Sequence, residues 1–192
     1  MATQAHGMYA KGYSDSDNYS NAINNGRIIT RGYYASGMLE KDGTTATNNE
    51  NIITRGDSAF GMTNFSYGVM VASPEDSSGS TTAVITNNGS ISTYGNWAFG
   101  MYIRGGYSPI PLNTNSDDNN EFVTEAVNNG DILTRGEVAC GMLALYDSTA
   151  INNGSIETNG LGSFGMLTLD GSTATNESDG TQPRMAKVLL VC

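Results

Sequence analysis

The chain is poor in the residues on which many enzymes and small extracellular domains depend. It has one histidine, His6, and two cysteines, Cys140 and Cys192, among 192 residues. A single histidine excludes His-based activation of a nucleophile and the usual His-rich zinc sites. Two cysteines cannot build a disulfide framework for a chain of this length, so burial and backbone hydrogen bonds must stabilise it. We therefore expect no catalytic site, no metal site and no cofactor.

Basic residues and long apolar runs are also scarce. Nine Lys and Arg residues stand against 19 Asp and Glu residues, which gives a formal net charge of -10. Such a chain lacks the dense basic surface that nucleic acid or an anionic membrane requires. No run of 18 apolar residues is present, and the N-terminus has no signal-peptide pattern. We expect neither a nucleic acid partner nor membrane insertion of this segment.

What the chain does have is an internal repeat rich in Asn, Gly, Ser and Thr. Its copies start 24, 39, 41 and 24 residues apart. A unit of 24 residues therefore carries two insertions, at about 63–84 and 102–125. We expect a β-solenoid over 1–178 and an off-pattern cap or tail over 179–192. The copies start near residues 22, 46, 85, 126, 150 and 174.

Each unit has the pattern of strands joined by turns. Ile and Thr columns lie two residues apart, which is the period of a β-strand, and a glycine follows where a corner needs backbone freedom. An Asn pair opens each copy, and its amides can bond identical amides one coil away. We expect ladders of Asn24, Asn48, Asn87, Asn128 and Asn152; of Ile28, Ile52, Ile91, Ile132 and Ile156; of Thr30, Thr54, Thr93, Thr134 and Thr158; and of Met8, Met38, Met62, Met101, Met142 and Met166.

Strands repeated in register, without room for a crossover helix, are typical of a parallel β-solenoid. A coil of 24 residues fits a right-handed, three-sided parallel β-helix, so we predict an all-β fold of about six coils, each rising roughly 4.8 Å. Counting by twos places the columns of Tyr34, Phe60 and Met62 inside, with the second strand ending at the Met column. The Ala35 column would then face outward as a small-residue strip. A change of parity at a glycine would instead place that column inside.

The phrase Asn-Asn-Gly-x-Ile-x-Thr-x-Gly-x-x-Ala-x-Gly-Met occurs at 24–38, 87–101, 128–142 and 152–166, with one Ser for Ala. It resembles the repeats of bacterial autotransporter passenger domains, although those repeats typically have an aliphatic residue where this chain has Met. The resemblance covers most of the chain. It implies a right-handed β-helix, secretion through a C-terminal barrel, a cell-surface or extracellular location, and commonly a role as adhesin or stalk. The chain looks like a passenger segment of a larger secreted protein.

The two insertions are the most economical place for a binding function, because a solenoid holds variable loops rigidly. They emerge at the same place in successive coils and contain aromatic and polar residues. Tyr67, Arg104 and Tyr107 are our candidate contacts for a host glycan or protein. A competing interpretation is that the insertions cover an exposed edge or an apolar face and bind nothing.

Two other features bear on ligands and association. The Arg column of Arg31, Arg55 and Arg135, broken by Tyr94 and Asn159, offers bidentate contacts to acidic glycans or sulfate. Asp57 and Glu137 could instead neutralise it, which would leave a solvated face. Unpaired strand edges at the ends, or the small-residue face, would allow homo-oligomers, whereas the segment 188–191 has the composition of a strand that could pair with the last coil.

The sequence therefore predicts a non-enzymatic surface segment that acts as an adhesin or a rigid stalk. A self-associating filament module is the alternative. A polysaccharide-processing fragment is not favoured, because the outward acids Asp57, Asp131, Glu137 and Glu157 occupy different columns. Ice binding is not favoured either, because the one Thr column is predicted to face inward.

Overall fold

The structure is a computed structural model that describes residues 5–12, 20–41, 44–65, 82–105, 123–177 and 188–190. Within these ranges every regular element is a β-strand, and every strand pairing is parallel. These ranges contain no helix that is long and apolar enough to cross a membrane.

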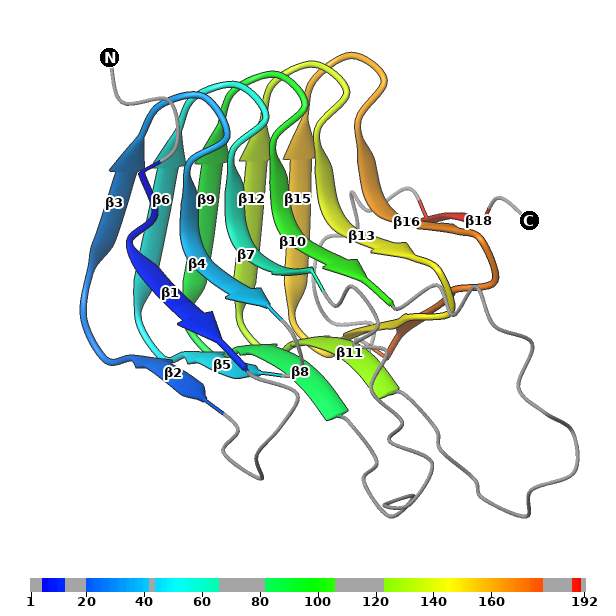
Figure 1. Cartoon of the computed structure of the whole chain (residues 1–192). Coiled ribbons are helices and arrows are strands. Elements are labelled where there is room, and N and C mark those ends of the chain that lie inside the picture. Colours follow the sequence, from blue (N-terminus) through cyan, green and yellow to red (C-terminus); the bar gives the residue numbers. More distant parts are fainter. Residues whose placement is uncertain are drawn as a thin grey trace, which may run out of the picture.

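Three parallel sheets form the sides of the coil (Figure 1). Sheet A contains, in spatial order, β1 (Met8–Lys11), β4 (Ser36–Lys41), β7 (Phe60–Phe65), β10 (Phe99–Arg104), β13 (Cys140–Leu145), β16 (Phe164–Leu169) and β18 (Val188–Leu190). Sheet B contains β2 (Asn21–Asn24), β5 (Thr45–Asn48), β8 (Thr82–Asn87), β11 (Val123–Asn128), β14 (Thr149–Asn152) and β17 (Thr173–Asn176). Sheet C contains β3 (Ile28–Arg31), β6 (Asn51–Arg55), β9 (Ser90–Tyr94), β12 (Asp131–Arg135) and β15 (Ser155–Asn159).

The chain passes from sheet B to sheet C to sheet A and then returns to sheet B one level further along the axis (Figure 1). The described residues form five complete coils, from β2–β3–β4 to β14–β15–β16, flanked by β1 and β17. A connection that returns to a neighbouring parallel strand of the same sheet is right-handed in almost all proteins, because of the twist of the strands. The molecule is a right-handed parallel β-helix, and the predicted fold class is confirmed.

Each coil has three strands, which agrees with the three sides predicted from the coil length, although the repeat pattern marked only two strands. The Met column was expected to close the second strand, yet Met38 is the third residue of β4, which continues to Lys41. The strands of sheet A continue past Met because the residues after Met alternate again, with Glu40 and Asn64 buried on the core side. The third strand is that of sheet B, which ends at the first Asn of each pair, as β5 ends at Asn48. Sequence counting missed the extension of sheet A because the residues after Met differ in chemistry from coil to coil.

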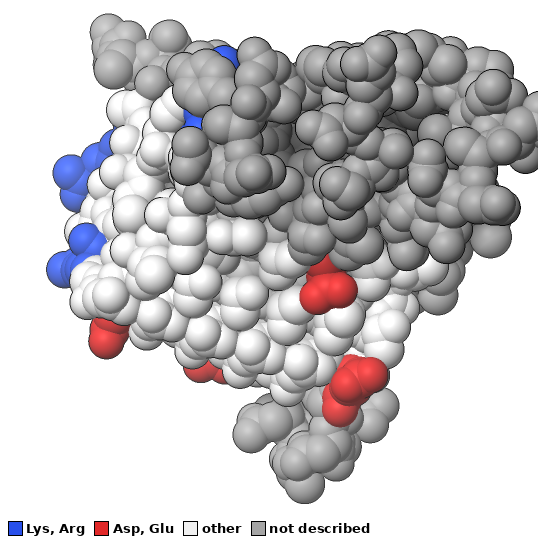
Figure 2. Space-filling view, turned by 60° about the horizontal axis from the view of Figure 1, so that its bottom comes forward, with Lys and Arg blue, Asp and Glu red and all other residues white. Residues whose placement is uncertain are grey.

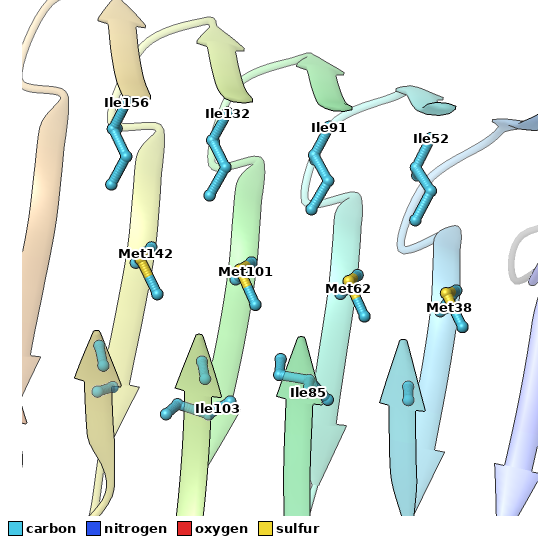
Figure 3. Close-up of a cluster of buried hydrophobic side chains, with 14 of the residues drawn as sticks. Met38, Ile52, Met62, Ile85, Ile91, Met101, Ile103, Ile132, Met142 and Ile156 are labelled. Carbon is cyan, nitrogen blue, oxygen red and sulfur yellow. The ribbon is translucent and has the colours of Figure 1, made fainter. Parts of the chain in front are cut away.

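Like side chains stack along the axis in the core. Figure 3 shows Ile52, Ile91, Ile132 and Ile156 in one row and Met38, Met62, Met101 and Met142 in another. Strand register brings each column together, as in the pairs Ile52–Ile91 and Met62–Met101. The inward Thr column lies beside the Ile row, and Thr54, Thr93 and Thr134 are fully buried. Flexible Met side chains fill the space that Ile leaves between sheets C and A.

At the corner between sheets C and A, the side chains that face the core are not those predicted by counting every second residue. Ala35, Ala59, Ala98 and Ala139 are completely buried, whereas Tyr34 and Trp97, expected inside, are 42% and 57% exposed. The Ala column therefore faces the core, as the alternative with a parity change required. The small-residue strip is not a surface on which a second copy could pack.

The physical reason is the backbone of the corner. Tyr34, Ser58, Trp97 and Val138 have left-handed φ values between 53° and 56°. Each of these residues donates its backbone N–H to the next coil, as Trp97 does to the carbonyl of Glu137 at 2.9 Å. A left-handed residue reverses the side on which the following side chain lies, so Ala98 turns inward and Trp97 outward.

Two Asn ladders close the corner between sheets B and C. In the inner ladder, Asn24, Asn48, Asn87, Asn128 and Asn152 each donate to the amide oxygen of the next coil, at 2.7 to 2.8 Å. In the outer ladder, each of Asn49, Asn88, Asn129 and Asn153 donates to the preceding coil, at 2.8 to 3.0 Å. The inner ladder is buried and the outer one is exposed.

Candidate ligand-binding surfaces

The two insertions leave the helix at the same corner of neighbouring coils. β7 ends at Phe65 and β10 ends at Arg104, and these two residues are partners in register. The following strands, β8 and β11, begin at Thr82 and Val123. The strands of sheets A and B therefore extend into both ends of the ranges 63–84 and 102–125 that the repeat assigned to insertions.

Of the three candidate contact residues, the structure places one. Tyr67 and Tyr107 lie outside the described residues. Arg104 ends β10, and its Cζ lies 4.7 Å from the ring centroid of Tyr146, the first residue after β13. A guanidinium group over an aromatic face is held by electrostatic attraction to the ring. Arg104 is therefore fixed at the base of the second insertion, and Tyr146 is a partner that sequence reasoning missed.

An aromatic cluster lies beside this base, on the outer side of sheet A. The rings of Phe60 and Phe99 stack at 5.6 Å, and Tyr102 lies 5.3 Å from both Phe60 and Phe65. Phe60 and Phe99 were expected in the core with the Met column. They face the other way because the inward direction is taken by the intervening Gly61: a Cβ atom there would meet Ile91 of the core. The alternation of inward and outward side chains therefore shifts by one residue before Met62. The cluster gives the insertions a rigid aromatic base.

The Arg column lies at the end of the outer face of sheet C. Arg31 pairs in register with Arg55, Arg55 with Tyr94, and Tyr94 with Arg135. The guanidinium groups of Arg55 and Arg135 each lie 5.9 Å from the ring centroid of Tyr94, one on either neighbouring coil. The sequence suggested that Tyr94 interrupts the Arg column. In the structure its ring lies between Arg55 and Arg135 and contacts both.

The outward acids do not gather into an active-site pair in the described part of the chain. Asp57 and Glu137 occupy the same corner position of the second and fourth coils, with Asn96 between them. Asp57 Oδ1 accepts a hydrogen bond from the Asn96 backbone N–H at 2.8 Å, which makes it a partner of the backbone. In these ranges no three His, Cys, Asp or Glu side chains come close enough to hold a metal ion.

The outer face of sheet B carries few charges, and Figure 2 shows charged side chains mainly at the margins of the face turned forward. Its strands present outward threonines that the sequence interpretation did not identify, such as Thr47 and Thr86, which are partners in register. Val127 and Ile151 continue the same rank. Because apolar side chains interrupt it, the rank does not form a regular hydroxyl array.

A family model described as the BigA third pectate lyase-like domain matches residues 1–110 and 112–180. This match covers nearly the whole chain, including the five coils. The chain belongs to this family. No curated protein and no solved structure matched the chain.

Membership in the BigA family agrees with the observed β-helix and with the coarser part of the resemblance, a β-helix segment of a bacterial surface protein. The words "pectate lyase-like" describe the fold of this BigA-type domain and show no activity. Its described cysteine, Cys140, is buried, and burial raises the pKa of the thiol to about 12. A raised pKa keeps the thiol protonated at neutral pH, and burial keeps it away from substrates, so both disfavour a nucleophilic role.

Proposed function

We propose that this BigA-type domain is a non-enzymatic adhesin segment that presents its two insertions, side by side, to a host glycan or protein. We also propose that it belongs to a larger secreted protein of the autotransporter type. The adhesin role is supported by the observation that the coil varies in length at one corner only. The connections from sheet C to sheet A all have four residues, whereas those from sheet A to sheet B differ from coil to coil.

Variation at one corner of a constant coil is typical of a scaffold that carries a variable binding element. The two long connections start from Phe65 and Arg104, which are in register and therefore roughly 4.8 Å apart along the axis. The aromatic cluster and the Arg104–Tyr146 contact stiffen this origin. A rigid origin reduces the entropy lost when the insertions bind a partner.

The test compares the full chain with a trimmed variant on an array of glycans and host-matrix proteins. In the trimmed variant, residues 66–83 and 105–124 are each replaced by the Tyr-Asp-Ser connection of residues 146–148, which restores the 24-residue coil. We expect the parent to bind and the trimmed variant to lose binding while keeping its β-sheet circular dichroism spectrum. Arg104→Ala should weaken binding, and Arg27→Ala, an exposed arginine at another corner, is the matched control.

Binding that survives trimming would show that the insertions are not the binding element. A well-folded parent that binds nothing on the array would reject the adhesin role and leave the stalk. A filament module is the second candidate, because within the described residues β15 and β17 have no strand paired beyond them. Rods whose length grows with protein concentration would support that candidate.

A further inference from the structure

A second surface has the chemistry of a binding site and lies on a different corner from the insertions. It is the corner between sheets C and A, which we call the C–A ridge. The ridge comprises residues 31–34, 55–58, 94–97 and 135–138, one segment from each of the first four coils. Coils one and three contribute exposed aromatic side chains, coils two and four contribute an arginine and an acid, and coil one also contributes Arg31.

The arginines of the ridge are available to a ligand. Arg31, Arg55 and Arg135 are exposed. Within the described residues, the guanidinium groups of Arg55 and Arg135 contact the Tyr94 ring and form no ion pair. The contact with the Tyr94 ring restricts each guanidinium group, whose N–H groups can still donate to a ligand. An oriented guanidinium binds a carboxylate bidentately with a smaller loss of side-chain entropy.

Asp57, one of the two acids of the ridge, is held by the backbone of the next coil rather than by an arginine. Asp57 Oδ1 accepts the Asn96 backbone N–H at 2.8 Å, and Asn96 Oδ1 accepts the Glu137 backbone N–H at 2.9 Å. These side chains stitch successive turns together, so Asp57 and Asn96 serve the backbone rather than the arginines. Their remaining oxygen and nitrogen atoms are suited to hydrogen bonds with hydroxyl groups.

The aromatic residues of the ridge occupy a backbone conformation that disfavours them. Tyr34 and Trp97 both have φ of 56°; Ser58 and Val138 have the same left-handed conformation in coils two and four, and the fifth coil has Gly162 there. A left-handed conformation costs a non-glycine residue roughly 1–2 kcal/mol. Trp97 is nevertheless 57% exposed, and Tyr33 and Tyr34 are 51% and 42% exposed. The corner imposes this conformation in every coil, so what distinguishes coils one and three is the exposed aromatic side chain that they place there.

The spacing along the axis defines the ligand. Tyr34 and Trp97, of coils one and three, are two coils apart, or about 9.6 Å. Arg55 and Arg135, the two arginines that contact Tyr94, have the same spacing, whereas Arg31 lies one coil from Arg55. This length is close to one disaccharide of an extended polysaccharide. Aromatic faces stack on sugar rings, and arginine pairs with an acidic group. We propose that the C–A ridge binds a linear polysaccharide with one carboxylate per disaccharide, which lies along the helix axis.

The experiment uses the full chain and three polysaccharide probes in isothermal titration calorimetry at low and high salt. Hyaluronan carries one carboxylate per disaccharide, polygalacturonate carries one per sugar, and dextran carries none. We expect hyaluronan to bind best and its affinity to fall as salt rises, because salt screens exposed charges. The double variant Arg55→Ala/Arg135→Ala and the single variant Trp97→Ala should each lower the affinity by about tenfold or more.

Matched controls separate this site from general effects. Arg27→Ala removes an exposed arginine from another corner, and Tyr9→Ala removes a 54% exposed ring from sheet A. Both controls should change the affinity by less than about twofold. The proposal is wrong if hyaluronan does not bind, if Arg27→Ala weakens binding as much as the double variant, or if either other probe binds as well as hyaluronan. The variant with trimmed insertions should retain hyaluronan binding, so this proposal and the adhesin role fail separately.

Discussion

At the scale of single residues, Glu40 is the least favourably placed group in the described core. It lies in β4, its side chain is completely buried, and neither carboxyl oxygen has a hydrogen-bond partner. Its neighbours in register are Ala10 and Asn64. Burial raises the pKa of this carboxyl group well above 4.5, because the low dielectric interior disfavours the charged form.

We therefore expect Glu40 to make stability depend on pH. With a pKa raised in the folded state, its favourable contribution is present below the unfolded pKa and is lost as pH rises through the folded pKa. Ile103 occupies the register position of Glu40 two coils further along the axis. Glu40→Ile should therefore fit the core, and it should raise the free energy of unfolding at neutral pH by about 1–3 kcal/mol. The gain should shrink towards pH 4. Urea titrations across this pH range measure it.

The exposed Glu137→Gln is the control for Glu40→Ile, and its effect should not follow the same pH profile. A Glu40→Ile protein that is less stable than the parent at neutral pH would show that the carboxylate has a stabilising partner.

The two Asn ladders offer a matched comparison of identical chemistry at different depths. Asn87 is fully buried, donates to Asn128 at 2.7 Å and accepts from Asn48 at 2.8 Å. Asn87→Ala leaves buried polar atoms without partners and should cost about 2–4 kcal/mol. Asn88→Ala breaks the exposed ladder, where water replaces the lost bonds, and should cost less than about 1 kcal/mol. Thermal and urea unfolding of both variants measure the difference, and equal losses would contradict the role of depth.

At the scale of elements, the glycine before each Met sets how closely sheets A and C approach. A Cβ atom on Gly100 would meet Cγ2 of Ile132 and would lie 2.6 Å from the Gly141 carbonyl oxygen. The backbone of the next coil cannot move away without breaking the sheet. This position therefore requires glycine, because any side chain there would prevent the close packing of the core.

We expect Gly100→Ala to lower the free energy of unfolding by about 1–3 kcal/mol, as overpacking of a core does. Gly26→Ala is the control, because nothing lies within 4 Å of a Cβ atom there. Gly26→Ala should change the free energy of unfolding by less than about 0.5 kcal/mol. A Gly100→Ala protein as stable as the parent would mean that the sheets separate easily at this level.

At the scale of the whole molecule, the ends of the β-helix decide whether it remains a monomer. β18 pairs with β16 in parallel, with Val188 opposite Met166 and Leu190 opposite Thr168. It therefore covers the edge that sheet A would otherwise present at the C-terminal end, which is the pairing the apolar composition of 188–191 suggested. Uncovered parallel edges are templates for another chain.

We expect a variant that ends at residue 182 to associate end to end, because the edge of β16 is then free. Sedimentation velocity over a range of concentrations should show larger species for this variant than for the full chain. Thr168→Pro in the truncated variant removes a backbone donor from the exposed edge and should reduce the association. A truncated variant that stays monomeric at all concentrations would show that the edge is not sufficient for a filament.

The sequence by itself determined the coil. Its 24-residue period, the Ile and Thr columns two apart, and the Asn pairs predicted a right-handed parallel β-helix, because identical residues stacked in register can form the same contacts in every coil. It also located the two insertions, since extra length cannot fit within a fixed coil. These features are local and periodic, so they can be recognised in the sequence without knowledge of the tertiary structure.

Only the tertiary structure decided which side each column faces and which columns act together. The left-handed backbone at Trp97 and the glycine before Met101 change the parity twice within one corner, and hydrogen bonds from the next coil fix the first change. The extension of sheet A beyond Met was hidden because Glu40, Asn64 and Ile103 share a register position but have different chemistry. The Arg55–Tyr94–Arg135 stack likewise depends on contacts between residues 39 to 41 positions apart, which the coil brings to about 4.8 Å.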